Sequence, residues 1–246
     1  PAGDEPPVEV AVPGPPAQIV ALDGLVLVTI RDPGLLLAMR PDPAAGLIET
    51  GRAELPADAW GVTVTPDLGT ALVTSAWTHQ VSAVDVATMK KRWSVDVARE
   101  PRAVVVRADG KSAYVTHLTR AALTRIDGVD GASPTVRDVA FPSAPLRTAP
   151  QHAEHASLGY AAVLSPAGDR LFVPRQGLGA KGLEQWNGYA TVDVLLTADE
   201  TPLAVPSKST SAMWSKDFQA RFGETDFSGN FVLKDPTITG PGPTQE

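Results

Sequence analysis

The chain contains no cysteine among its 246 residues. This absence excludes disulfide bonds, thiolate zinc sites, iron–sulfur clusters and the Cys-x-x-Cys-His attachment of c-type haem. Positive charge is also scarce, because 21 Lys and Arg against 28 Asp and Glu give a formal net charge of −7. No basic run follows a phosphate backbone, and no apolar run approaches the ~20 residues of a membrane-spanning helix. Nucleic acid and the bilayer interior are therefore not expected as partners, nor covalently bound haem as a cofactor.

A hairpin-like segment recurs along the chain. Trp60–Thr74 aligns without a gap with Arg102–Thr116 and with Tyr160–Pro174, and Gln18–Thr29 is a shorter copy. Each copy has two alternating apolar runs around a tight turn, the sequence pattern of a β-hairpin. Repeats of roughly 40–50 residues built from short strands are typical of β-propeller blades, which bury their faces by stacking around an axis. The sequence predicts an all-β fold, a β-propeller with about four recognisable blades.

The repeat divides the chain into three parts. Residues 1–17 are a proline-rich lead-in, for which an extended spacer is expected, with an ordered strand at Val8–Val12 as the alternative. Residues 18–206 carry the blades, with four strands in each and the innermost strand first. Residues 207–246 lack the repeat and are interpreted as an irregular tail or a linker to missing blades.

Blade four is the least regular. It begins at Tyr160, after an insertion within Phe141–Ser157 that is expected to be a long loop. A second insertion, Gln176–Gly188, is expected to separate the second strand from a third at Thr191–Leu196. Leu203–Val205 is the candidate for the fourth strand.

Four blades either close a small ring or belong to a larger one. The unpatterned tail favours the larger ring, because an unclosed array of repeats exposes blade faces that need a cap. A second polypeptide or a missing C-terminal half would then complete the ring.

Two groups of motifs carry a family resemblance. Tyr114–His117 (YVTH) and Leu72–Ser75 (LVTS) resemble the YVTN-type repeats of seven-bladed β-propellers in bacterial exported proteins. Leu164–Arg175 and Ala190–Ala204 resemble the propeller halves associated with di-haem proteins of the MauG or cytochrome c peroxidase type. The resemblance implies the N-terminal half of a seven-bladed ring and a periplasmic or extracellular location, with an anchor upstream of residue 1 as one option. Any haem would belong to a partner or to a missing segment.

All four histidines map to one rim of the predicted propeller. His79 and His117 fall in loops between second and third strands, and His152 and His155 fall in the loop that precedes blade four. These two kinds of loop lie at the same end of a blade, and imidazoles gathered there could ligate copper or zinc. The alternative is that the histidines are solvated or hydrogen-bonded locally, because spacing fixes no third ligand.

Tryptophan and arginine, which are enriched at interaction hot spots, map to the same rim. For the tryptophans, packing between neighbouring blades is the alternative role. The candidates for a partner-binding rim are Trp60, Trp77, Arg102, Arg175 and Trp186.

The predicted function is that of an exported binding or scaffold module. Its rim would dock a redox partner, such as a di-haem cytochrome-like domain, or a substrate. The chain is not expected to be catalytic by itself, since no Gly-x-Ser-x-Gly elbow or comparable constellation occurs; the resemblance leaves open that it is the non-haem part of a peroxidase- or MauG-like redox assembly. The alternatives are a metal- or cofactor-dependent propeller enzyme, dehydrogenase-like or lactonase-like, with a His-lined site on that rim, and a purely structural surface repeat.

Overall fold

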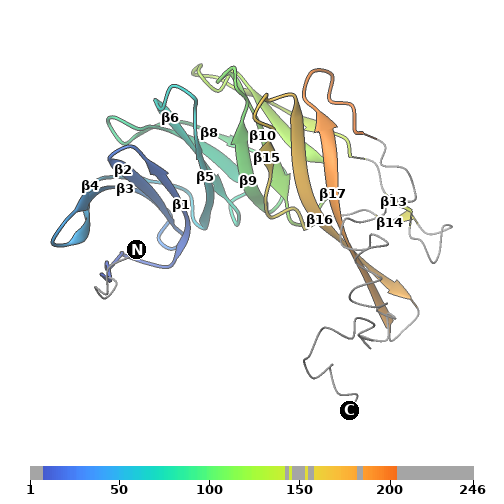
Figure 1. Cartoon of the computed structure of the whole chain (residues 1–246), viewed down its shortest axis with the longest axis horizontal. Helices are drawn as coiled ribbons and strands as arrows, with labels where there is room; N and C mark the ends of the chain where they lie inside the picture. The colour runs from blue at the N-terminus through green and yellow to red at the C-terminus, as the bar shows by residue number, and fades with distance from the viewer. Residues whose placement is uncertain (1–7, 142–143, 146–152, 155–157, 182–184, 204–246) are drawn as a thin grey trace, which may run out of the picture. The chain divides into compact units, whose positions relative to one another are not determined.

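The structure, a computed structural model, describes residues 8–141, 144–145, 153–154, 158–181 and 185–203. Every regular element in these ranges is a β-strand (Figure 1), which confirms the predicted all-β class. No helix long and apolar enough to cross a membrane is found in them. The chain forms two compact units: residues 1–118 with 123–139, and residues 119–122 with 140–246.

The first unit contains three antiparallel sheets of four strands each, and in every sheet the spatial order follows the chain order. They correspond to the first three predicted blades. Blade 1 comprises β1 (Pro16–Leu22), β2 (Leu25–Ile30), β3 (Leu35–Asp42) and β4 (Gly46–Glu54). Blade 2 comprises β5 (Ala59–Val64), β6 (Thr70–Ser75), β7 (Gln80–Asp85) and β8 (Lys90–Asp96). Blade 3 comprises β9 (Pro101–Val106), β10 (Ser112–His117), β11 (Leu123–Asp127) and β12 (Thr135–Val139).

Strand alternation gives the sheet of blade 2 two apolar faces, one for blade 1 and one for blade 3. In β6, Ala71 and Val73 pack in the layer shared with blade 1, whereas Leu72 packs in the layer shared with blade 3. Each fully buried Leu or Val stabilises the stack by about 1.5–3 kcal/mol. The blades therefore hold together chiefly by these two layers, as the alternating pattern of the sequence predicts.

The first two strands of each blade break register at the same place. The shift lies between Pro16 and Ile19 in blade 1 and between Ala59 and Val62 in blade 2. In blade 3 it lies at the β9–β10 pair, just before His117. A register break leaves a backbone N–H outside the strand ladder, and a buried N–H needs another acceptor.

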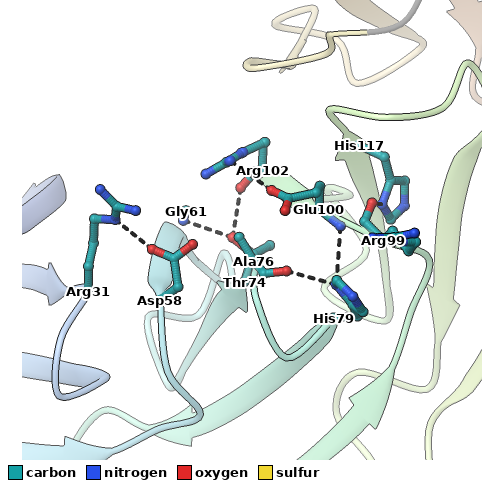
Figure 2. Close-up of polar contacts among 10 residues, drawn as sticks. All are labelled: Arg31, Asp58, Gly61, Thr74, Ala76, His79, Arg99, Glu100, Arg102 and His117. Carbon is teal, nitrogen blue, oxygen red and sulfur yellow. Dashed lines mark hydrogen bonds and ion pairs between the residues drawn. The ribbon is translucent and has the colours of Figure 1, made fainter.

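A threonine in β6 supplies that acceptor and at the same time joins two blades. The Thr74 hydroxyl accepts the N–H of Gly61 at 2.8 Å and donates to the carbonyl oxygen of Arg102, in blade 3, at 2.7 Å (Figure 2). We call this arrangement the threonine bridge. It ties the innermost strands of two blades together through one hydroxyl.

The full bridge recurs in blade 1, and its accepting half is also present in blade 3. In blade 1, the Thr29 hydroxyl accepts the N–H of Gln18 at 3.0 Å and donates to the carbonyl oxygen of Trp60 at 2.8 Å. In blade 3, the Thr116 hydroxyl accepts the N–H of Ala103 at 3.0 Å. Thr29 and Thr74 thus connect neighbouring blades as well as being strand residues.

Gly61 stands where the two backbones approach most closely. A Cβ atom at this position would lie 2.1 Å from the Arg102 carbonyl oxygen and 3.0 Å from the Thr74 hydroxyl. Only glycine fits without moving blade 2 away from blade 3.

At the opposite edge of the sheets, aspartates cap the tight turns. Asp67 lies in the β5–β6 turn, and Asp85 is the last residue of β7, just before the β7–β8 turn. The pKa of Asp67 is lowered by hydrogen bonds from the Thr65 hydroxyl and then from the Gly69 N–H. The pKa of Asp85 is lowered by the hydroxyl and the N–H of Thr88. Both turns therefore favour the ionised carboxylate.

The second unit contains the fourth repeat. Its three-stranded sheet consists of β15 (Val163–Leu164), β16 (Arg170–Lys181) and β17 (Gln185–Leu196). A separate pair, β13 (Ala144–Pro145) with β14 (Ala153–Glu154), lies within the segment that was expected to be a long loop.

The expected separation at Gln176–Gly188 is wrong. β16 and β17 pair continuously from Arg170 opposite Leu196 to Lys181 opposite Gln185. The insertion lengthens both strands of one hairpin, because antiparallel pairing satisfies the backbone groups of both arms at once.

The fourth strand of the last blade is less regular than the sequence predicts. A fourth strand in the last blade is represented by a single bridge between Leu195 and Pro202 and by a bond from the Leu203 N–H to the Val194 carbonyl oxygen. Residues from 204 onward, including Val205 and the predicted tail, lie outside the described residues. At the other end, Val8–Val12 is not part of a strand. The three-part division at residues 17 and 206 stays a prediction.

Replacing Gly61 with Ala is expected to lower the free energy of unfolding by about 2–4 kcal/mol, because the new methyl group overlaps the Arg102 carbonyl oxygen. The matched control is Gly69→Ala. A Cβ there would meet only the Asp67 carboxylate, at 3.5 Å, so a change within about 0.5 kcal/mol is expected. Urea unfolding measures both. Equal stability of the two variants would show that the blades do not approach at Gly61.

Acid is expected to destabilise the fold through the capped turns. Because the folded pKa values of Asp67 and Asp85 lie below the ordinary value of 3.8, their contribution is present above pH 3.8 and is lost as the pH falls through the folded values. The double variant Asp67→Asn/Asp85→Asn keeps acceptor oxygens but cannot titrate. Its urea midpoint should therefore fall less between pH 4.5 and 2 than that of the parent. The control is Asp23→Asn in the β1–β2 turn, and a parent-like pH dependence of the double variant would refute the role of the caps.

Candidate functional site

One edge of the first unit collects the loops to which the sequence assigned the candidate site. Register places the start of β5 beside the end of β6, since Ala59 pairs with Ser75, and the start of β9 beside the end of β10, since Pro101 pairs with His117. The blades are also joined along this edge, where the Asp58 N–H donates to the Arg31 carbonyl oxygen at 2.7 Å. We call this edge the loop rim; Figure 2 shows ten of its residues.

Trp60 lies between two guanidinium groups on the loop rim. The Cζ atom of Arg31 is 4.7 Å from the ring centroid, and that of Arg102 is 4.1 Å away. The three side chains come from blades 1, 2 and 3, so the stack spans the whole first unit. Such contacts contribute about 0.5–2 kcal/mol each, more where they are desolvated. Trp60 and Arg102 therefore join neighbouring blades. For Trp60, packing between blades is the alternative role that the sequence left open.

Both arginines of this stack are paired with carboxylates. Arg102 Nη2 lies 2.8 Å from Glu100 Oε2, and Arg31 Nε lies 2.5 Å from Asp58 Oδ1 (Figure 2). The pairs neutralise the positive charge that a row of guanidinium groups would otherwise concentrate at the rim.

Asp58 is a rim residue that the sequence did not single out. Its side chain is 1% exposed, its φ angle is 61°, and its second carboxylate oxygen, Oδ2, is buried without a hydrogen-bond partner. A buried carboxylate is retained only when a cation pairs with it, which Arg31 does here. No sequence motif links Arg31 with Asp58. The pair forms only because the fold brings the loop after β2 next to the loop before β5.

Trp77 differs from the other described tryptophans in its exposure. It lies in the short loop between β6 and β7, and 63% of the residue is exposed to solvent. Trp60 is half-buried and Trp93 is buried in the core. An exposed indole on a tight loop loses little conformational entropy when a partner covers it, which makes it a strong candidate contact residue.

His79 follows in the same loop and uses one ring nitrogen. Its Nδ1 atom lies 2.8 Å from the Ala76 carbonyl oxygen and 3.3 Å from the Glu100 backbone nitrogen (Figure 2). One nitrogen cannot donate and accept in the same tautomer. The shorter contact, to a carbonyl, assigns the proton to Nδ1 and leaves Nε2 as the acceptor.

His117 is a structural residue of blade 3. Its side chain is 1% exposed, with Nδ1 3.1 Å from the Arg99 carbonyl oxygen and Nε2 2.8 Å from the Thr124 hydroxyl. Both ring nitrogens are thus engaged within the fold. This arrangement corresponds to the local hydrogen bonding that the sequence left open as the alternative to metal ligation.

The predicted copper or zinc site has four candidate histidine ligands, and two of them remain to be placed. His152 and His155 lie outside the described residues. Among the residues that are described, no group of three or more His, Asp or Glu side chains is placed to hold a metal ion. A copper or zinc site stays a prediction, and in the first unit the nitrogen best suited to it is Nε2 of His79.

Arg175 and Trp186, the remaining rim candidates, belong to the second unit. Arg175 is buried, with Nε donating to Asp193 Oδ2 at 2.7 Å and Nη1 to the Ala121 carbonyl oxygen at 2.9 Å. Its guanidinium group also stacks over Phe141 at 4.4 Å. Trp186 lies in β17 opposite Ala180, and its side chain is outside the described residues. The structure thus places Trp60, Trp77 and Arg102 on the loop rim of the first unit, with Trp60 and Arg102 in contact, and places the other two in the second unit.

Comparison with solved structures identifies the architecture. Hydrazine synthase from Kuenenia stuttgartiensis matches with a TM-score of 0.58 and 18% identity, over 81% of this chain and 51% of the other. The β-propeller domain of Cps50 (Swd1) from Myceliophteria thermophila matches with a TM-score of 0.58 and 10% identity, over 79% and 56%. A protein provisionally assigned as a 6-phosphogluconolactonase, from Bacteroides fragilis, matches with a TM-score of 0.54 and 15% identity, over 75% and 54%.

The chain spans about half the length of the structures that it matches. No protein-family profile matches it, and no curated protein does. Identities this low are evidence for the fold alone. Together with the stacked four-stranded sheets, they establish that the chain has a β-propeller fold.

Proposed function

We propose that this chain is a β-propeller binding module that docks a protein partner through the loop rim of its first unit. The observation that carries the proposal is the exposed indole of Trp77, which stands in a loop anchored at both ends in blade 2. Ser75 and Gln80, which flank the loop, are paired in the sheet. A rigid aromatic contact on a fixed loop is the usual centre of a protein interface.

The charged residues of the loop rim suit a polar interface border. Glu100, Arg99 and Arg102 lie on the same rim (Figure 2), and the Arg102–Glu100 pair is formed before any partner arrives. Preformed pairs limit the ordering that docking must impose on the rim. Charged residues of this kind set partner choice and association rate more than affinity.

The partner that the sequence resemblance suggests is a di-haem cytochrome-like domain, met in the periplasm or outside the cell. Further blades, from a second polypeptide or from more of the same chain, would complete the ring. In this proposal the chain contributes docking and positioning, and the partner contributes the redox chemistry.

Replacing Trp77 with Ala is expected to weaken binding of a purified di-haem protein of the MauG type at least tenfold, since central aromatic contacts carry about 2 kcal/mol or more. Leu68→Ala is the matched control, because Leu68 is also an exposed apolar turn residue but lies at the opposite edge of blade 2. Biolayer interferometry gives both affinities, and urea unfolding shows that each variant remains folded.

Two results would contradict the proposal. One is a parent protein that fails to bind the di-haem probe. The other is an equal loss of affinity in both variants, which would place the contact away from the loop rim. Copper or zinc bound in stoichiometric amount and lost on His79→Ala would instead support the His-lined alternative.

A further inference from the structure

The sheet of blade 1 has a second apolar face that points away from blade 2. Its side chains are buried, none of them more than 5% exposed, and they form a core cluster separate from the layer between blades 1 and 2. We call this surface the outward face; it consists of Val28, Ile30, Leu35, Leu37 and Met39.

The outward face differs from the equivalent face of blade 2. In blade 1, the cross-strand pairs are Val28 with Leu37 and Ile30 with Leu35. The same ladder positions in blade 2 hold the pairs Val73–Ser82 and Ser75–Gln80.

Two of the polar residues of blade 2 on this face are hydrogen-bonded, one to the loop from blade 1 and one within blade 2. The Ser75 hydroxyl donates to the Pro56 carbonyl oxygen, in the loop that joins blades 1 and 2, at 3.0 Å. Ser82 is hydrogen-bonded to Ser94 at 2.8 Å. Blade 1 replaces these groups with Ile and Leu, so its outward face is built for an entirely apolar neighbour.

The lead-in supplies that neighbour. Val10 and Val12 pack against the outward face, whereas Glu9 and Ala11, which alternate with them, are exposed. The segment forms no strand ladder with the sheet. The side that faces blade 1 is therefore identified from the packing of its side chains.

Both ends of this segment lie close to blade 1. At its C-terminal end, the Arg31 N–H donates to the Pro15 carbonyl oxygen at 2.9 Å, and a Cβ atom at Gly14 would overlap the Asp32 carbonyl oxygen. At its N-terminal end, a Cβ atom at Gly46 would meet Val8 Cγ1 at 3.0 Å and Val10 Cγ2 at 3.2 Å. Two glycines thus make room for the lead-in, one within it and one in blade 1.

We propose that Val8–Pro15 is an intramolecular strap that covers the outward face of blade 1 in the place of a neighbouring blade. The strap buries apolar surface that would otherwise be open to aggregation or to a second copy of the chain. Further blades or another chain could occupy this face only by displacing the strap. The inference is independent of the loop rim and of the partner proposed for it.

The absence of native cysteine allows a direct test. Val28→Cys introduces a thiol under the strap, and Val73→Cys introduces one at the equivalent position of blade 2, under blade 1. Each is combined in the full chain with Val10→Ser/Val12→Ser, which removes the apolar contacts of the strap, or with Glu9→Ser/Ala11→Ser, which alters only its exposed residues. The rate of reaction with Ellman's reagent is measured for all combinations.

The expected result is at least a tenfold faster reaction at position 28 with Val10→Ser/Val12→Ser, no change at position 73, and no effect of Glu9→Ser/Ala11→Ser. A thiol at position 28 that reacts quickly in every background, or slowly in every background, would overturn the proposal. Equal acceleration at both positions would also overturn it, since the substitutions would then act on the whole fold. If the double strap variant does not fold, Val12→Ser alone is measured, with a smaller increase expected at position 28 only.

Discussion

The hydroxyl group of one threonine in blade 1 and of one in blade 2, Thr29 and Thr74, is the contact on which the first unit depends. Within its own blade, the hydroxyl accepts the buried N–H that the register break between the first two strands leaves without a ladder partner. The same hydroxyl also donates to a carbonyl oxygen in the innermost strand of the next blade. Leaving such buried groups unpaired costs about 1–3 kcal/mol each, so the geometry of one blade constrains that of the next.

The loop rim follows from this spacing. With the innermost strands held at the distance of a hydroxyl bridge, Arg31, Trp60 and Arg102 come into stacking contact across three blades. The stack and its two carboxylate partners occupy the base of the rim, which leaves Trp77 as the exposed aromatic residue of the β6–β7 loop. The scaffold residues and the candidate contact residue are thus separate, although the sequence places them in one group.

The sequence was sufficient for the fold because the relevant signals are local. Alternation, turn residues and the spacing of the repeat define strands, hairpins and the order of the blades. The long hairpin of β16 and β17 was missed because the glycine-rich composition of Gln176–Gly188 is typical of loops, and only pairing between its two arms makes it a strand.

The site was less predictable, since its properties depend on contacts between distant residues. His117 is assigned to a rim loop by its position, but the carbonyl group of Arg99 and the hydroxyl of Thr124 bury it in blade 3. Asp58 and Arg31 pair only across the junction of two blades. The lead-in has the composition of a spacer, and its apolar residues acquire a role only beside the outward face of blade 1.

The threonine bridge is tested most directly by comparing Thr74→Val with Thr74→Ser. Valine keeps the shape of the side chain but removes the hydroxyl partner of the Gly61 N–H and of the Arg102 carbonyl group. A loss of about 2–4 kcal/mol and faster hydrogen exchange at the Gly61 amide are therefore expected. Serine keeps the hydroxyl and should lose about 1 kcal/mol, with the amide still protected. Equal stability of the two variants, with unchanged exchange at Gly61, would contradict the account.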